Sequence, residues 1–287
     1  MLPEKARAVR FDRYGGREVL HVTDIDMPSP GEGEVLVEIR AAGINPGEAG
    51  IRVGAMHEMF PATFPSGEGS DLAGVVVGVG PGVTEFAPGD EVMGFSLRRS
   101  SHATHATVPV GQLIHKPAQL PWEVAGSLYV VGVTAYAAVR AVAPQPGETI
   151  AVSAAAGGVG SLVVQLLALH EAQVLGIASA RNADWLRAHH VVPVQYGDGL
   201  QARLRDAAPA GIDAFIDLFG PEYVQLAVDL GVAPERIETI ISFAKAAEVG
   251  AKTEGSMDAS TPQVLAEMAD LVASGAIDVD IAASYPL

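Results

Sequence analysis

The residues most suited to chemistry form a run of small side chains, AAGGVG, at positions 155–160. The run keeps the spacing of the G-x-G-x-x-G nucleotide-binding motif, with Ala155 in the first place and glycines at Gly157 and Gly160. In that motif the first position makes a tight turn, the second lets a pyrophosphate approach the main chain, and the third lets a helix pack close to a strand. A helix that begins here would also offer free N–H groups to an anion. The predicted diphosphate-binding set is Ala155, Ala156, Gly157, Gly158, Val159 and Gly160.

The flanking sequence supplies the strand and the helix that the motif requires. TIAVS precedes the run as an apolar strand, and an amphipathic helix is predicted from about 159 to 171. Beyond about 121, further apolar strand segments alternate with helical ones, which predicts βαβ units and a parallel sheet covered on both faces. The alternative is a Gly/Ala-rich turn that binds nothing, but the complete strand–turn–helix context favours a nucleotide.

The first 120 residues have a different pattern, with short apolar segments in place of alternating strands and helices. EVLVEIRAAGI (34–44) alternates apolar and polar residues, and LAGVVVGVG (72–80) is a Gly-rich run of valines. Prolines and glycines separate such short segments, as in a small β-barrel. We therefore divide the chain into a barrel domain at 1–120, a nucleotide-binding domain at 121–260, and a segment at 261–287 that returns toward the first domain.

The end of the second predicted strand selects the nucleotide. A carboxylate there would bind the adenosine ribose hydroxyls and select NAD. Here QVLGIAS is followed by Ala-Arg-Asn, so Ser179 offers a hydroxyl and Arg181 a planar cation, and both suit a 2′-phosphate. The sequence predicts NADPH as the cofactor. An ordinary solvated arginine at a strand end is the alternative for Arg181.

Composition excludes several classes of function. The 287-residue chain has no cysteine, which rules out disulfides, thiolate zinc sites and cysteine nucleophiles. Its net charge of −16 disfavours nucleic acid and anionic membranes as partners. Two close histidine pairs, at 102/105 and 189/190, lack a third ligand at suitable spacing, so no metal site is predicted. No run is long and apolar enough for a membrane span and no signal core is present, so we expect a cytoplasmic protein.

Six segments in order resemble one known family. They are FDRYGGREVL, EVLVEIRAAGINP, GSDLAGVVVGVGPGVTEFAPGDEVMG, GVTAY, AAAGGVG and GIDAFIDLFG. This series resembles the zinc-free quinone oxidoreductase (zeta-crystallin-like) branch of the medium-chain dehydrogenases/reductases. The resemblance implies an α/β fold in which a GroES-like β-barrel catalytic domain accompanies a Rossmann doubly wound parallel-sheet domain, and it implies a homodimer. The family usually continues beyond IAASYPL, so we expect part of its C-terminal portion to be missing from 261–287.

The resemblance also bears on the reaction. Zinc-dependent relatives carry Cys in the AGIN stretch and His-Glu in the GSD stretch, where this chain has Asn45 and Ser70-Asp71. Without a Lewis acid to polarise an alcohol, hydride transfer to a quinone or α,β-unsaturated carbonyl (enone) acceptor is favoured. Several members carry a Tyr over the substrate site where this chain has Gly50. That departure leaves an NADPH-binding redox sensor or scaffold with little turnover as the alternative.

The resemblance finally suggests individual site residues. Asn45 is expected near the nicotinamide ribose and the substrate, with its amide donating to a carbonyl oxygen; a plain turn residue before Pro46 is the alternative. With no Tyr at position 50, the proton would come from solvent or another hydroxyl, for which Tyr129 is one candidate. Further cofactor contacts are expected at Thr134, at Tyr196 beside the 2′-phosphate, and at Ser242 and Phe243 beside the nicotinamide. An apolar lid, or simply closure of a core, is expected of Met56, Met59, Phe60 and Phe64.

Overall fold

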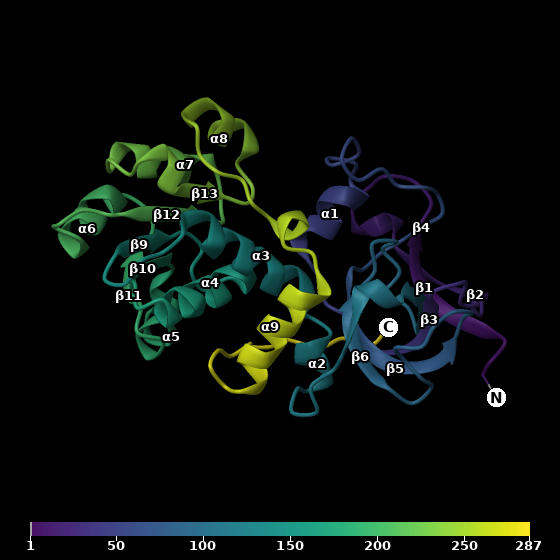
Figure 1. The fold of residues 1–287 in the computed structure, drawn as a ribbon. Helices are drawn as coiled ribbons and strands as arrows, with labels where there is room; N and C mark the ends of the chain where they lie inside the picture. The colour runs from purple at the N-terminus through teal and green to yellow at the C-terminus, as the bar shows by residue number, and fades with distance from the viewer. Residues whose placement is uncertain (1) are drawn as a thin grey trace. The chain divides into compact units, whose positions relative to one another are not determined.

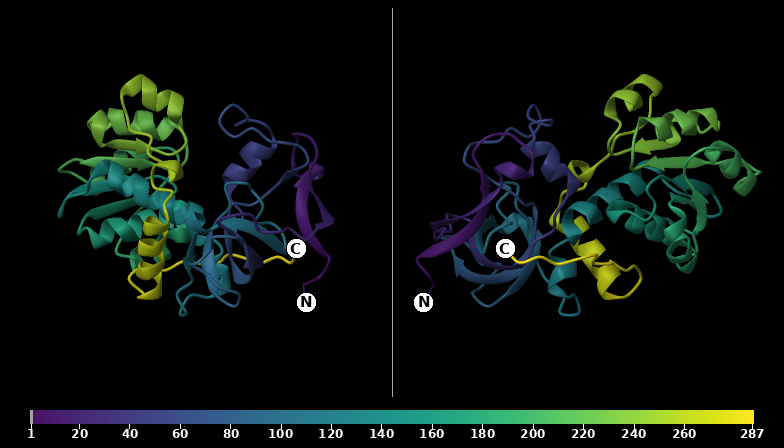
Figure 2. Two further views of the ribbon diagram at one scale, coloured as in Figure 1. Left: turned by 45° about the vertical axis from the view of Figure 1, so that its right-hand side comes forward. Right: turned by 180° about the vertical axis from the view of Figure 1, so that it is seen from behind.

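The chain forms two compact units in the computed structural model, which describes residues 2–287 (Figures 1 and 2). The barrel unit comprises the chain up to Val130 together with 261–276 and 280–287; the sheet unit comprises 131–260 and 277–279. The boundary lies inside helix α3 (Leu128–Val142), ten residues beyond the position expected from the sequence. Residues 261–276 group with the barrel unit.

Two antiparallel sheets build the barrel unit. One has the strand order β2-β1-β4 and the other β7-β3-β5-β6-β8. The alternation in β3 (Glu34–Ala41) and the valine run in β5 (Asp71–Val79) place Val35, Val37 and Val76 in the buried core. The remaining strands are β1 (Lys5–Phe11), β2 (His21–Asp26), β4 (Ser66–Gly67), β6 (Glu91–Phe95), β7 (His105–Pro109) and β8 (Leu113–His115). The helices are α1 (Pro46–Arg52), α2 (Trp122–Ala125) and α9 (Pro262–Ala273).

A five-stranded parallel sheet forms the centre of the sheet unit, in the order β11-β10-β9-β12-β13. The strands are β9 (Thr149–Val152), β10 (Gln173–Ala178), β11 (Val192–Gln195), β12 (Ala214–Asp217) and β13 (Ile237–Thr239). The helices between them are α4 (Gly158–Leu169), α5 (Ala183–Ala188), α6 (Leu200–Ala207) and α7 (Pro221–Asp229), and α8 (Phe243–Val249) follows β13. Helices lie over both faces of the sheet in Figure 1, which explains why its strands are apolar without alternation. The predicted parallel sheet is confirmed.

The strand order of the sheet unit reverses at its centre. Strand β9 has β10 on one side and β12 on the other, so chain connections leave it in opposite directions. Ligands of open α/β sheets bind beyond the carboxyl ends of the strands at such a point. The AAGGVG run follows β9 directly and therefore lies where this topology places a ligand. No helix within residues 2–287 is long and apolar enough to cross a membrane.

One buried charge in the sheet unit makes stability depend on pH. Glu238 on β13 is fully buried, and neither carboxylate oxygen has a hydrogen-bond partner. Burial raises its pKa from 4.5 to about 8. Between these pH values the folded state holds a proton that the unfolded state releases, so stability falls as pH rises through this window.

We predict that Glu238→Gln stabilises the protein at high pH, because it removes the buried carboxylate. The gain in unfolding free energy should be small at pH 5 and about 1 to 3 kcal/mol at pH 8.5. Urea denaturation at both pH values measures it, with exposed Glu235→Gln as the matched control. A gain that does not change with pH would contradict the assignment.

Candidate functional site

The turn after β9 has the geometry of a dinucleotide-binding loop. Ala154 adopts a left-handed backbone conformation (φ 47°) and makes the tight turn, one residue before the predicted position. Ala155 is buried, and its N–H donates to Ile177 O on the neighbouring strand (3.1 Å). Gly157 is the N-cap residue of α4. The first N–H groups of a helix have no hydrogen-bond partner within the helix itself.

The two glycines of the motif have different surroundings. A Cβ on Gly160 would lie 2.1 Å from Ala154 O, because helix and turn approach each other at this point. A Cβ on Gly157 would have one close neighbour, Ala154 O at 3.2 Å. Gly160 therefore serves packing, whereas Gly157 leaves one side of the main chain uncovered by other atoms of the protein.

The residues predicted to bind a 2′-phosphate lie at the ends of two adjacent strands. Tyr196 N donates to Ala178 O (3.3 Å), which places the end of β11 beside Ser179. The Ser179 hydroxyl is buried and has no hydrogen-bond partner, although a buried hydroxyl normally has one. Arg181 is exposed two residues further on, and the Tyr196 side chain is 53% exposed. This hydroxyl, this cation and the open side of Gly157 fit a dinucleotide that carries a third phosphate.

A second buried carboxylate of the sheet unit connects the carboxyl ends of its central strands. Asp217, at the end of β12, accepts the hydroxyls of Ser153 (2.8 Å), Thr239 (2.8 Å) and Ser242 (3.0 Å). The Ser242 hydroxyl thus holds strand ends together, while Phe243 is exposed at the start of α8. Thr134 is buried in α3. Sequence reasoning missed the role of Asp217, although its place at the end of an apolar strand within GIDAFIDLFG was a usable signal.

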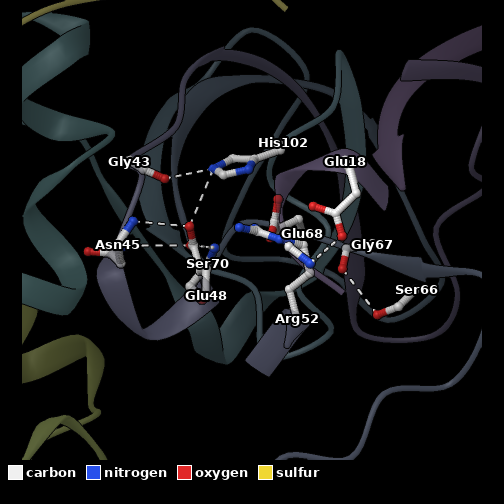
Figure 3. A network of polar contacts seen from close by, with 11 residues as sticks. Glu18, Gly43, Asn45, Glu48, Arg52, Ser66, Gly67, Glu68, Ser70 and His102 are labelled. Carbon is white, nitrogen blue, oxygen red and sulfur yellow. Dashed lines mark hydrogen bonds and ion pairs between the residues drawn. The ribbon is translucent and has the colours of Figure 1, made fainter. Parts of the chain in front are cut away.

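Asn45 lies in a buried polar network in the barrel unit (Figure 3). It caps α1, and its backbone N–H donates to Glu48 Oε2 (3.0 Å). Its side-chain Nδ2 donates to Asp71 Oδ2 (2.8 Å) and lies 3.5 Å from Glu48 Oε1. Both amide hydrogens thus face carboxylates, and the amide atom left for a ligand is the acceptor Oδ1. The sequence had suggested a donor at this position.

Asp71 is fully buried at the start of β5. Its Oδ1 accepts the N–H of Val130 (2.7 Å), and its Oδ2 accepts the amide of Asn45. Burial raises its pKa to about 7, although both hydrogen bonds act in the opposite direction. The chain passes so close at Gly43 that a Cβ there would lie 2.6 Å from Asp71 Oδ2.

Two further groups complete this network: Glu48, which the sequence did not single out, and His102, which the sequence noted only as one of a close histidine pair. Glu48 is buried, and its Oε1 accepts the Ser70 N–H (3.0 Å). Burial raises the pKa of Glu48, while the nearby His102 opposes the rise. His102 Nε2 lies 2.7 Å from Gly43 O and 3.9 Å from Glu48 Oε2. Figure 3 also shows Arg52 of α1 paired with Glu68 beside this network.

The residues predicted as a proton donor and as a lid differ in their burial and in their contacts. Tyr129 is buried, with its ring stacked on Phe95 at 4.0 Å. Phe64 packs edge-on against Phe11 and Tyr14, while Met59 is 62% exposed and Phe60 is half-buried. A Cβ on Gly50 would lie 3.1 Å from Met56 Sδ, so Met56 covers the position where family members carry a Tyr. Among residues 2–287 no three His, Cys, Asp or Glu side chains are arranged to hold a metal ion.

Comparison with known proteins agrees with both units. Residues 31–146 match the alcohol dehydrogenase GroES-like domain family. The chain is 30% identical to the Homo sapiens quinone oxidoreductase over 235 residues, covering 79% of this chain and 69% of the relative. It is 32% identical to the Mus musculus quinone oxidoreductase over 225 residues, covering 75% and 67%. The aligned region thus spans about two thirds of the length of these relatives.

Solved structures extend the similarity over nearly the whole chain. The Escherichia coli quinone oxidoreductase complexed with NADPH superposes with a TM-score of 0.84 at 25% identity, covering 96% of this chain and 90% of that one. The Coxiella burnetii quinone oxidoreductase gives a TM-score of 0.85 at 25% identity, covering 97% and 90%. With its GroES-like barrel unit and Rossmann sheet unit, the chain belongs to the zinc-free quinone oxidoreductase branch of the medium-chain dehydrogenase/reductase family of oxidoreductases.

Proposed function

We propose that this protein is an NADPH-dependent reductase of quinones or enones that works without zinc. The observation that carries the proposal is the end of β10, where a buried hydroxyl without a partner, that of Ser179, lies two residues before the exposed Arg181. Relatives named quinone oxidoreductase, and an Escherichia coli structure complexed with NADPH, support the same cofactor and acceptor.

In this proposal the sheet unit binds the nucleotide mainly through its main chain. The N–H groups at the start of α4 bind the diphosphate, and the open side of Gly157 lets it approach. Ser179 and Arg181 bind the 2′-phosphate, which an acidic side chain at either place would repel. When bound, the nicotinamide supplies the hydride, so the protein's task is to orient the reactants and exclude competing reactions.

The barrel unit supports zinc-independent chemistry in the same proposal. Asn45 and Asp71 stand where zinc-dependent relatives carry ligands, and here they bind each other (2.8 Å). An acceptor that is already electrophilic needs a positioned hydride and a proton rather than a Lewis acid. Because Gly50 has no hydroxyl, the proton comes from water or from another hydroxyl of the protein.

The direct test follows NADPH absorbance in stopped-flow mixing with a panel of quinones and enones. We expect oxidation of NADPH by at least one acceptor, with no loss of rate after treatment with a strong zinc chelator. Tight NADPH binding with no turnover on any acceptor would contradict the proposal and favour the redox sensor, for which Gly50 is the motivating feature.

The two glycines of the turn allow a matched test of the nucleotide site. Gly157→Ala should leave the midpoint of thermal unfolding nearly unchanged but weaken NADPH and NADH binding roughly 10- to 100-fold, the cost of losing charge-assisted hydrogen bonds to phosphate. Gly160→Ala should instead destabilise the fold by about 1 to 3 kcal/mol, because its new methyl group meets backbone atoms. Calorimetric titration and thermal unfolding measure both, and unchanged affinity in Gly157→Ala would argue against a diphosphate at this turn.

Arg181 should set the choice between the two nucleotides. We predict that Arg181→Glu weakens NADPH binding roughly 10- to 100-fold and changes NADH binding much less, because only NADPH carries the 2′-phosphate. Calorimetric dissociation constants for both nucleotides decide this, with Arg205→Glu, an exposed arginine on α6, as the control. Equal losses for NADPH and NADH would remove the basis for assigning NADPH.

A further inference from the structure

We infer that the barrel unit has a binding site of its own for a small organic anion, a phosphate or carboxylate group carried on an apolar body. The site is a cavity of about 470 Å³ lined by β1, by residues 63–67 and by residues between 98 and 107. Every described residue that lines it precedes Val130, so the cavity belongs to the barrel unit alone. The inference does not depend on the proposed function.

The cavity is lined by cations although the protein as a whole is acidic. Three arginines and two histidines contribute to its walls, and none of the described lining residues is an aspartate or a glutamate. The arginines are Arg10 on β1 and Arg98 and Arg99 on the loop before β7. The whole chain, in contrast, has 34 Asp and Glu against 18 Lys and Arg. Cations gathered on one concave surface raise the local concentration of anions.

Two of the three guanidinium groups have no carboxylate partner. Arg98 Nη1 pairs with Glu34 Oε1 (2.7 Å). The Arg99 side chain instead donates to the main-chain carbonyls of residues 60 and 61 (3.4 and 2.8 Å), and its buried Nε has no hydrogen-bond partner. The guanidinium of half-buried Arg10 makes no hydrogen bond or ion pair with any described residue. A partly buried cation without a counter-charge costs free energy, which a bound anion offsets.

The alternation of β1 places Arg10 on the side of the strand that faces the cavity. Successive side chains of a strand point to opposite faces, so Arg10 shares a face with Ala8, which also lines the cavity and is only 6% exposed. Asp24 and Asp26 of β2 stand opposite odd-numbered residues of β1, on the other face. These two acidic side chains therefore point away from Arg10 and do not neutralise it.

Strand β7 supplies polar groups to the cavity wall. Ala106 and Val108 of β7 belong to the core of the barrel unit. His105 and Thr107 alternate with them and therefore point away from that core, and both line the cavity. Burial lowers the pKa of His105, so its imidazole is neutral at pH 7 and the positive charge of the site comes from the arginines.

The volume and the lining of the cavity define the class of ligand. A cavity of about 470 Å³ falls in the range of roughly 300–1,000 Å³ that is usual for small-molecule sites, so it has room for an organic body beside the anionic group. Ile25, Pro28 and Pro65 supply apolar wall for that body. The planar fork of Arg10 suits a phosphate or a carboxylate, which it binds through two parallel hydrogen bonds.

Phenyl phosphate and benzoate are the probes, because they carry the two anionic groups on the same apolar ring, and phenol is the uncharged control. Calorimetric titration at low ionic strength measures their binding to the parent protein and to Arg10→Gln. We expect the parent to bind at least one of the two anions, and Arg10→Gln to bind it roughly tenfold more weakly, because a charge-assisted contact is lost. Arg13→Gln, at an exposed position, is the matched control and should bind the anion as the parent does. The probe that binds more tightly identifies the anionic group.

Arg181→Gln separates this cavity from the nucleotide site proposed in the sheet unit. A site in the barrel unit predicts that Arg181→Gln binds the anion as the parent does. If neither anion binds to the parent, or if binding is lost in Arg181→Gln and kept in Arg10→Gln, the inference is wrong whether or not the protein reduces quinones. Anion binding that depends on Arg10 in a protein that binds no nicotinamide nucleotide would contradict only the proposed function.

A second variant reaches the same cavity without a change at Arg10. Thr107→Glu adds a carboxylate to the wall formed by β7 and should weaken anion binding at least roughly tenfold, through repulsion and through pairing with the arginines. Thr253→Glu, at an exposed position of the sheet unit, is its control. Thermal unfolding shows which variants are folded. If Arg10→Gln does not fold, the folded Thr107→Glu variant decides: weakened binding supports the inference, and parent-like binding overturns it.

Discussion

Each unit contains a fully buried carboxylate, Asp71 in the barrel unit and Asp217 in the sheet unit. Hydrogen bonds, rather than an opposite charge, stabilise each of them. Moving an ion out of water costs several kcal/mol unless donors surround it. Asp217 meets this cost with three hydroxyls and the N–H groups of Phe219 and Gly220 (3.0 and 3.1 Å), and so joins the carboxyl ends of three strands. Asp71 accepts from the Asn45 amide and the Val130 N–H, and burial raises its pKa to about 7 against these two hydrogen bonds. One candidate site residue in each unit is among these donors: Ser242 for Asp217 and Asn45 for Asp71.

The parallel sheet and the turn of small residues after β9 could be predicted from sequence because their signals are local. Apolar strands alternate with amphipathic helices, and small residues stand where helix and turn pack together, as at Gly160, where an added Cβ would lie 2.1 Å from Ala154 O. The tight turn itself falls at Ala154, one residue early, because the motif fixes spacing but not which residue adopts the left-handed conformation. The boundary between the units lies inside α3. The sequence gives no signal for its position, because the same helical pattern continues on both sides of it.

The polar networks could not be predicted in the same way. Asn45 and Asp71 are 26 residues apart, and Ser153 and Asp217 are 64 apart, so no periodicity links them. Asn-Pro reads as a turn or a helix cap, and Asn45 does cap α1, but the direction of its amide depends on what β5 places opposite. Sequence therefore singled out Asn45, but the partner of its amide Nδ2 follows only from the contact with Asp71 that the fold brings about.

The acidic composition and the proposed phosphate ligand are compatible for a physical reason. A net charge of −16 acts over the whole surface and is screened within about 10 Å at ordinary ionic strength. The contacts at the turn are backbone N–H groups and a hydroxyl, which carry no net charge and act at hydrogen-bond distance. In the proposed site, one arginine at the end of β10 distinguishes a nucleotide with a third phosphate from one without it. An acidic surface is therefore compatible with the proposed dinucleotide site, because the contacts of that site are confined to the carboxyl ends of a few strands.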